Sequence, residues 1–227
     1  MNPNLEAKNT VKADGQVCEY VTTCGTVNGA PRIMIIGNSV TRHEPCAGIG
    51  WNFNHGMAAS APERDYVHIV ESAVLEKYPN AEFCVVQASR WEFKYKSCDL
   101  EEQFSMAKDF APDLIITVIS ANIPKDDFTK EDFIYQMGRL HTYLSGGRRI
   151  PMIQTTSFFG NTAKNEAIKE YCELSGTTFV DITDLGANEE NLAIGKFEHS
   201  GVAHHPGDLG MKRIAERIIE KINGIEL

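Results

Sequence analysis

The sequence has little positive charge and no long apolar run, and both features limit the partners that it can have. Its 227 residues include 22 Lys and Arg against 31 Asp and Glu, a formal net charge of −9. Nucleic acids and anionic membranes are bound through basic patches, so this balance indicates neither as a partner. No apolar run reaches the roughly 20 residues that span a bilayer, and residues 1–14 lack the apolar core of a signal peptide. We therefore expect a cytoplasmic protein.

Cysteine and histidine are too scattered to indicate a metal centre or a redox motif. No Cys-x-x-Cys pair occurs, and the histidines before the last loop show no metal-ligand spacing. We expect neither a metal nor an organic cofactor. A disulfide between Cys18 and Cys24 is compatible with the sequence, but thiols stay reduced in the cytoplasm, and we expect all six cysteines to be free. They are Cys18, Cys24, Cys46, Cys84, Cys98 and Cys172.

The composition is that of a globular protein with one main domain. Hydrophobic residues make up 42% of the chain and charged residues 23%. A chain of this length buries roughly 70% of its unfolded surface, so its core is large enough for folding without disulfide or metal cross-links. We divide it into an N-terminal extension, residues 1–30, and a domain, residues 31–227. Within the extension, the β-forming stretch 17–24 favours a short edge strand or hairpin.

Apolar segments alternate with amphipathic ones along the domain. Strands are expected at 33–36, 81–87, 113–119, 150–155 and 178–182, and helices at 63–77, 100–110, 130–144, 162–175 and 208–222. Largely apolar strands separated by amphipathic helices predict a parallel α/β sheet that is covered on both faces. Such sheets place their sites beyond the carboxyl ends of the strands.

Polar residues follow several of these strands. Ser39 comes after the first strand, Ser89 after the second and Asn122 after the third, and His205 lies just before the last helix. Each has an ordinary structural explanation, because serine and asparagine are common in turns and helix caps. A serine, an amide and a histidine in this order, each at a strand end or in the final loop, nevertheless favour a hydrolytic site.

Three segments resemble the motifs of the SGNH, or GDSL-type, hydrolases. Gly37-Asn38-Ser39-Val40 is similar to the Gly-Asp-Ser-Leu motif, and Ser120-Ala121-Asn122-Ile123 is similar to Gly-x-Asn-Asp. His205-Pro206 is similar to the final motif, whose histidine precedes the terminal helix. The resemblance covers residues 31–222. It implies a three-layer αβα sandwich with a flavodoxin-like parallel sheet of about five strands, and hydrolysis of an ester.

The chain also departs from these motifs. Asn38 stands where the family has aspartate, Ser120 where it has glycine, and Ala88-Ser89 matches the glycine of the second motif. The triad acid of the family lies three residues before the histidine, and that position is Val202. The site is therefore a Ser–His dyad, or another group orients the imidazole: either Glu198, the nearest upstream carboxylate, or a backbone carbonyl.

The resemblance implies the role of each residue. Ser39 is the nucleophile and His205 its base, although His204 is a rival, and Pro206 favours His205. The backbone amides of Ser39 and Ser89 and the side chain of Asn122 form the oxyanion hole.

A long loop, residues 41–61, follows the nucleophile, and long loops in compact domains are often functional. Aromatic and amide groups suit a sugar, so we expect Trp51, Trp91 and Asn161 to bind substrate, although the two tryptophans could equally be packing residues. We favour removal of acetyl groups from a carbohydrate or glycoside.

Several alternatives stay open at this point. A lipid acylhydrolase or thioesterase of the same fold and an inactive binding protein are both compatible with the residues. A phosphate-binding protein is less so, because no Gly-x-Gly-x-x-Gly or Walker pattern occurs. The expected partner is a small ester, and association of identical copies is compatible with the sequence.

Overall fold

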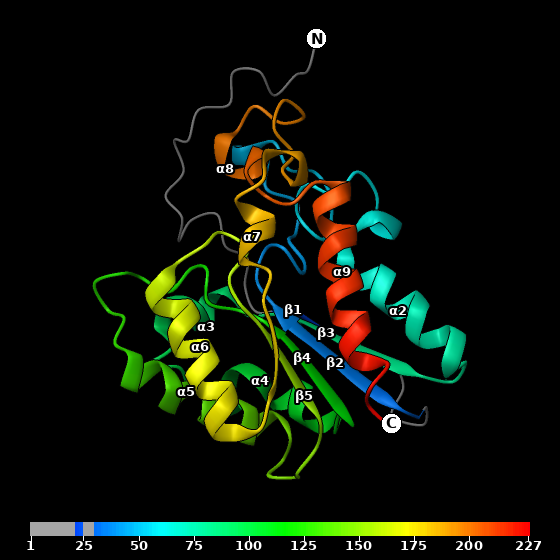
Figure 1. Cartoon of the computed structure of the whole chain (residues 1–227), viewed down its shortest axis with the longest axis vertical. Coiled ribbons are helices and arrows are strands. Elements are labelled where there is room, and N and C mark those ends of the chain that lie inside the picture. The colour runs from blue at the N-terminus through cyan, green and yellow to red at the C-terminus, as the bar shows by residue number, and fades with distance from the viewer. Residues whose placement is uncertain (1–20, 25–29) are drawn as a thin grey trace.

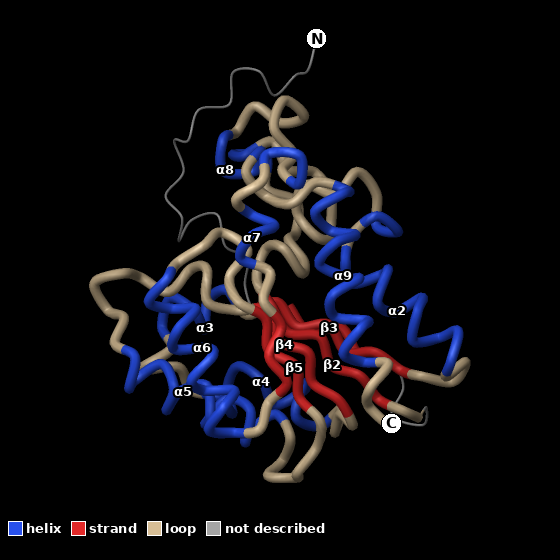
Figure 2. The backbone as a smooth tube through the Cα atoms, in the orientation of Figure 1, coloured by secondary structure: helices blue, strands red, loops and turns tan. Residues whose placement is uncertain are grey.

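The computed structural model describes residues 21–24 and 30–227. Six strands form one sheet in the order β1-β3-β2-β4-β5-β6 (Figures 1 and 2). Their bounds are β1 Val21–Cys24, β2 Arg32–Gly37, β3 Glu82–Gln87, β4 Leu114–Val118, β5 Met152–Thr155 and β6 Thr178–Val180. Strands β2 to β6 are mutually parallel, and β1 pairs with β3 in the antiparallel sense. The predicted parallel α/β sheet is confirmed.

Helices cover both faces of the sheet. The helices are α2 Tyr66–Lys77, α3 Ser89–Lys94, α4 Leu100–Asp109, α5 Lys130–Leu144, α6 Thr162–Ser175, α7 Thr183–Gly186, α8 Ser200–Ala203 and α9 Asp208–Ile222, with 3-10 turns η1 Ala47–Ile49, η2 Pro62–Arg64 and η3 Glu189–Asn191. Helices α2 and α9 pack on one face, and α3 to α6 pack on the other (Figure 1). Within the described ranges, no helix is both long and apolar enough to cross a membrane.

Strand β2 shows why residues 33–36 are all apolar. Ile33 and Ile35 face the core beneath α2 and α9, whereas Met34 and Ile36 face the core beneath α3 to α6. Successive side chains of a strand point to opposite faces, so a central strand covered on both sides has no solvent-facing position. Strand β2 is thereby a central strand of the sheet, and Ser39 lies two residues beyond its end at Gly37.

The prediction that all six cysteines are free is wrong. Cys84 in β3 is disulfide-bonded, so the six cysteines are not all free thiols. The antiparallel register of β1 against β3 sets Cys24 opposite Cys84 along the backbone. The alternative pairing of Cys18 with Cys24 involves Cys18, which lies outside the described residues. Strand pairing between segments 60 residues apart is set by the tertiary fold, and cysteine spacing alone does not reveal it.

Candidate active site

Ser39 lies on a tight turn that leaves the carboxyl end of β2. The backbone amides of Thr41 and Arg42 donate to the carbonyl oxygen of Asn38 at 2.9 and 3.0 Å. Gly37 is required at the end of the strand, because a Cβ there would lie 1.8 Å from Oγ1 of Thr41. The turn leaves the Ser39 side chain half-buried, at the edge where parallel sheets carry their sites.

The structure brings Ser39 and His205 into contact although 166 residues separate them. Oγ of Ser39 and Nε2 of His205 are 2.7 Å apart. On the other side of the ring, Nδ1 of His205 lies 2.6 Å from the carbonyl oxygen of Gly201. A carbonyl only accepts hydrogen bonds, so Nδ1 carries the proton and Nε2 is the acceptor for the serine hydroxyl. A serine hydroxyl that donates to a neutral imidazole is an arrangement capable of nucleophilic chemistry.

A backbone carbonyl therefore occupies the position that a triad carboxylate would take. Glu198 and a backbone carbonyl were the two groups expected to orient the ring, and the contact to Nδ1 comes from the carbonyl oxygen of Gly201. Val202, at the position of the family's acid, is buried in an apolar cluster with Ile49, Trp51 and Met57. The helical turn of α8 is the reason, because it points the Gly201 carbonyl at the ring four residues later.

The surroundings of His205 keep its ring neutral. Burial lowers the pKa of His205 to about 4, and the nearby His43, His199 and His204 act in the same direction. The hydrogen bond to Gly201 opposes this shift. A neutral imidazole is the form that can accept a proton from a hydroxyl group.

His204 is placed differently. Its side chain is exposed, and its Nδ1 lies 2.6 Å from the carbonyl oxygen of Ser200. The ring that contacts Ser39 is that of His205. Of the two neighbouring histidines, only His205 has a hydrogen-bond contact with Ser39 among those that the described residues make.

Asn122 is linked to the turn at residues 38–42 because both donate hydrogen bonds to the carboxylate of Glu92. Nδ2 of Asn122 donates to Oε2 of Glu92 at 2.6 Å, and Nδ2 of Asn38 donates to Oε1 of the same residue at 3.2 Å. Asn38 directly precedes Ser39, so one side chain links the serine turn and the loop after β4. Asn122 and Asn38 thereby share the carboxylate of Glu92 as their acceptor.

Ser89 is not an oxyanion donor in this structure. Its backbone amide donates to Oε1 of Gln87 at 3.0 Å, and its hydroxyl accepts from Nε2 of Gln87 at 2.9 Å. Both Gln87 and Ser89 are buried. The expectation that the Ser89 amide binds an oxyanion is wrong for this reason: a buried glutamine side chain already occupies it.

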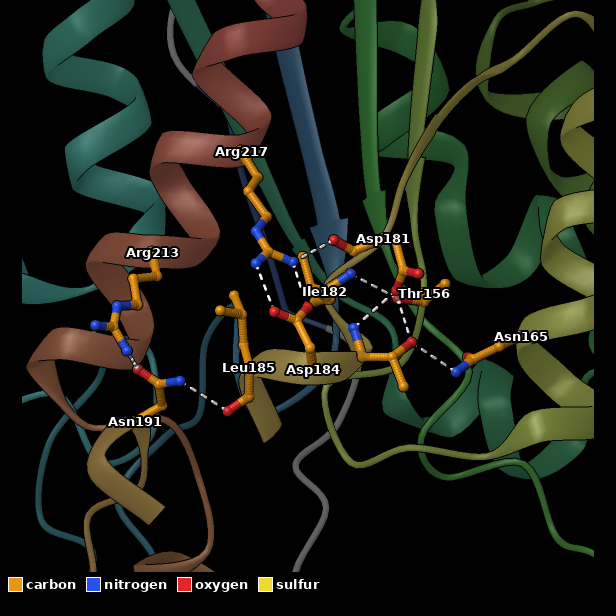
Figure 3. A network of polar contacts seen from close by, with 10 residues as sticks. Thr156, Asn165, Asp181, Ile182, Asp184, Leu185, Asn191, Arg213 and Arg217 are labelled. Carbon is orange, nitrogen blue, oxygen red and sulfur yellow. Dashed lines mark hydrogen bonds and ion pairs between the residues drawn. The ribbon is translucent and has the colours of Figure 1, made fainter. Parts of the chain in front are cut away.

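A polar network holds the loop that carries His205 against the body of the protein. Asn191 donates to the carbonyl oxygen of Leu185 at 2.9 Å, and Arg213 of α9 donates to Asn191 at 2.7 Å (Figure 3). The backbone continues this attachment, because Gly207 donates to Asn191 at 2.8 Å and Ala193 to His205 at 3.0 Å. The base is thereby fixed at both ends of its loop.

The same view shows how the loop after β5 is held. Thr156 donates to Asp181 at 3.0 Å and accepts from the amide of Ile182 at 2.8 Å (Figure 3). In addition, Arg217 of α9 binds Asp184 through both of its terminal guanidinium nitrogens. Residues after β5 lie beside the base: the rings of Phe159 and His205 are 5.0 Å apart, centre to centre.

The two tryptophans are packing residues. Trp51 is buried, and its Nε1 donates to the carbonyl oxygen of His43 at 3.0 Å. Trp91 is buried in the core beneath α3 to α6. Neither has a free ring face for a sugar, so the expectation that they bind substrate is wrong, and the packing alternative describes both. Phe159 is 40% exposed and has such a face.

Two cavities are lined in part by residues that follow β5. A cavity of about 10 Å³ is lined by Asn38 and Val40 of the nucleophile turn and by Phe159. A cavity of about 510 Å³ is lined by Asn161, Thr162, Asn165 and Phe179, and Thr156 lines both. Asn161 also caps α6, because its side chain accepts from the amide of Lys164 at 3.1 Å.

Gly201 and Lys164 were not singled out in the sequence, and Glu92, which follows the second expected strand, was expected only to line the substrate pocket. Gly201 acts through a carbonyl, which any residue carries, so no signal marks it. Glu92 and Lys164 are buried charged residues, and both contact the loop that carries Asn122. Their only sequence signal is a position shortly after a strand end. Among the described residues, no group of three His, Cys, Asp or Glu side chains is arranged to hold a metal ion.

No protein-family model and no curated protein matches the chain. Solved structures do. A two-domain esterase active on acetylated mannans has a TM-score of 0.53 and 18% identity, over 85% of this chain and 49% of its own. A family two carbohydrate esterase from Clostridium thermocellum has a TM-score of 0.56 and 13% identity, over 86% and 64%. A G-D-S-L family lipolytic protein from Veillonella parvula has a TM-score of 0.52 and 14% identity, over 86% and 99%.

These matches differ in how much of each partner they cover. The chain spans about half the length of the two-domain esterase and almost the whole of the Veillonella protein. At such low identities the likeness concerns the path of the backbone rather than the substrate. It agrees with the five parallel strands and their flanking helices. The chain has the αβα-sandwich fold of the SGNH, or GDSL-type, hydrolases.

Proposed function

We propose that the chain is a serine ester hydrolase that removes short acyl groups, acetyl above all, from a carbohydrate or glycoside. The observation that carries this proposal is the 2.7 Å contact between Oγ of Ser39 and Nε2 of His205 at the carboxyl end of a parallel sheet. This contact supports the proposal, because a serine hydroxyl within hydrogen-bond reach of an imidazole nitrogen is the arrangement that activates a serine for attack. Within the described ranges, we assign the ester hydrolysis to this pair of side chains alone.

The reaction runs in two halves. As Oγ of Ser39 bonds to the ester carbonyl carbon, His205 takes the serine proton on Nε2 and then returns it to the leaving sugar oxygen, whose bond to carbon breaks. Water next attacks the acyl-enzyme, His205 accepts its proton, and the carboxylic acid leaves as Ser39 regains a proton. The imidazolium that forms in each half is stabilised at Nδ1 by the Gly201 carbonyl.

The oxyanion of each tetrahedral intermediate needs donors that are already in place. We assign this role to the backbone amide of Ser39 and to Nδ2 of Asn122, and we leave Ser89 out because its amide is engaged. Loss of one such donor typically costs about 3 kcal/mol of transition-state stabilisation. Asn122→Ala should therefore lower kcat by about 100-fold or more.

The surroundings of the nucleophile favour a small acyl group. The cavity beside Asn38 and Val40 measures about 10 Å³, roughly the room that one water needs, and a long acyl chain would not enter it. The larger cavity beyond Thr156 and the exposed ring of Phe159 support a sugar on the leaving-group side. The activity of the mannan esterase on acetylated polysaccharide agrees with this assignment.

A panel of esters tests the proposal. We would measure hydrolysis of p-nitrophenyl acetate, butyrate and octanoate, and acetate release from acetylated mannan oligosaccharides. Wild-type protein should prefer acetate, and Ser39→Ala and His205→Ala should each lose about 1000-fold or more in kcat. Ser72→Ala is the matched control, because Ser72 is exposed on α2.

The outcomes separate the alternatives. Activity that rises with chain length would favour a lipid acylhydrolase. Activity that survives both substitutions would reject Ser39 and His205 as the reacting pair. A wild-type protein that binds acetylated oligosaccharide but releases no acetate would favour the binding protein. Phe159→Ala should raise KM for the oligosaccharide and leave KM for p-nitrophenyl acetate within about 3-fold, if the ring contacts the sugar.

The disulfide at Cys84 bears on where this reaction takes place. Disulfides persist in oxidising compartments and are rare in the cytosol. We therefore propose an oxidising environment in place of the cytoplasm expected from the sequence. Thiol titration of the denatured protein, purified with and without reductant, tests this: equal thiol counts would return the proposal to the cytoplasm.

A further inference from the structure

Glu92 is a fully buried carboxylate with three donors around it. Its exposed fraction is 0%. Oε1 accepts from Nδ2 of Asn38 at 3.2 Å and from the amide of Ser120 at 2.5 Å, and Oε2 accepts from Nδ2 of Asn122 at 2.6 Å. Burial raises the pKa of Glu92, and these hydrogen bonds act against that shift. All three donors belong to motif segments: Asn38 to the segment that carries Ser39, and Ser120 and Asn122 to the segment 120–123.

Lys164 holds the same loop from another direction. It is 4% exposed, and Nζ donates to the carbonyl oxygens of Ser120 at 2.9 Å, Ala121 at 3.4 Å and Ile123 at 2.6 Å. Its three ammonium hydrogens match these three acceptors. Burial lowers the pKa of Lys164, and the negative charge of Glu92 opposes that effect. The segment 120–123 thus lies between a buried anion and a buried cation.

The orientation of the Asn122 amide follows from this arrangement. Of its two ends, only the NH₂ group can face a carboxylate, because the amide oxygen would be repelled. One amide hydrogen goes to Glu92, and the second stays available for an oxyanion. Glu92 also binds Asn38, the residue before Ser39. The Glu92 side chain therefore contacts both the turn that carries Ser39 and the loop that carries Asn122.

Holding the segment 120–123 in place does not by itself require two buried charged side chains. Taking a carboxylate and an ammonium out of water costs several kcal/mol for each ion, and apolar residues of similar volume are often as stable. Here both charges converge on the four residues that present Asn122, and one of them also reaches the nucleophile turn. Positioning of the site accounts for that convergence.

We propose that Glu92 and Lys164 are a positioning pair for the oxyanion hole. Glu92 holds the amide of Asn122 in register with the Ser39 turn, and Lys164 fixes the backbone of the loop that carries it. The inference rests on the proposed ester hydrolysis at Ser39, which it deepens. It assigns both residues to turnover, through Asn122, and not to binding of substrate.

A double-mutant cycle between Glu92 and Asn122, measured with p-nitrophenyl acetate as substrate, tests the positioning role of Glu92. Glu92→Gln keeps the volume and one acceptor but turns an NH₂ group toward that of Asn122. We expect kcat to fall by about 10- to 100-fold with KM changed less than about 3-fold. In an Asn122→Ala background the same change should lower kcat by less than about 3-fold, because the group it positions is gone. Equal losses in both backgrounds would overturn the inference.

Stability is controlled with a buried hydrogen bond elsewhere. Tyr171→Phe removes the contact between the tyrosine hydroxyl and Nδ1 of His141, 2.7 Å long and on the far part of α6. It should lower the thermal midpoint and leave kcat within about 2-fold. Lys164→Met serves as the second positioning variant, with kcat expected to fall in the same range. If neither Glu92→Gln nor Lys164→Met gives folded protein, the pair serves folding, and the inference is rejected.

Covalent labelling separates this inference from the function itself. A fluorophosphonate reagent should modify Ser39 of the wild type, seen by intact mass, and react about 10-fold or more slowly with Glu92→Gln. A wild type that neither labels nor hydrolyses esters would reject the proposed function. A wild type that labels, together with a Glu92→Gln variant that labels at the same rate, would reject only the positioning role.

Discussion

The ring of His205 donates from Nδ1 to the carbonyl oxygen of Gly201 at 2.6 Å. A carbonyl is a neutral acceptor, so it fixes the tautomer and the tilt of the ring without adding a buried negative charge. Gly201 lies four residues before His205, on the short helix α8, and backbone geometry therefore makes this contact. The ring of His205 is therefore oriented by the main chain.

The first prediction distinguishes the two adjacent histidines. His205→Ala should lower kcat/KM for p-nitrophenyl acetate by about 1000-fold or more, since it removes the group that takes the serine proton. His204→Ala should keep it within about 3-fold, because that exposed ring contacts Ser200. Both variants are measured beside each other, with circular dichroism to show that each is folded. A large loss in His204→Ala alone would reverse the assignment.

The second prediction concerns pH. Burial lowers the pKa of His205 to about 4, and only the neutral ring accepts a proton from Ser39. Above this pKa the base is neutral and active, and below it the imidazolium is inactive. The acid limb of kcat/KM should therefore lie near pH 4, well below the value of about 6.5 for an unperturbed histidine. Acetate release measured from pH 3.5 to 8 checks this, and a limb near 6.5 would contradict it.

The third prediction concerns the missing triad acid. Val202 occupies the position of that acid and is buried among apolar side chains. Val202→Asp should not raise kcat, and it should lower the free energy of unfolding by about 3 kcal/mol or more, because an unpaired carboxyl group would be buried. Urea unfolding provides the measurement, with Val202→Ala as the size control at about 1–3 kcal/mol. A gain in kcat would show that the site accepts a carboxylate there.

The fourth prediction uses backbone strain at Ser120. Its φ is 138°, a region that favours glycine, and its buried Oγ has no hydrogen-bond partner. Such a conformation costs about 1–3 kcal/mol for a residue with a side chain, and the family motif has glycine at this position. Ser120→Gly should raise the free energy of unfolding by about 1 kcal/mol with kcat within about 3-fold.

Ser157→Gly is the matched control for this substitution, because Ser157 is also buried but does not have a positive φ. It should be destabilising, as glycine gains freedom in the unfolded chain. Equal destabilisation by both substitutions would show that Ser120 is unstrained.

Much of the fold was predictable because it rests on local periodicity. Helices α5, α6 and α9 begin and end at the expected residues, since each has an apolar stripe at helical spacing. Helices α3, α7 and α8 were not expected: they have six, four and four residues, too few for a periodic pattern to emerge.

The sequence by itself determined the αβα layers, the serine after the first strand and the histidine before the last helix, because apolar periodicity and short motifs are local properties. The tertiary structure decided what surrounds them. Strand order β3-β2-β4 brings Glu92 between Asn38 and Asn122, and α8 supplies the Gly201 carbonyl. It also buried the two tryptophans and engaged the Ser89 amide. These contacts depend on which distant segments become neighbours, and that is settled by how the whole sheet packs.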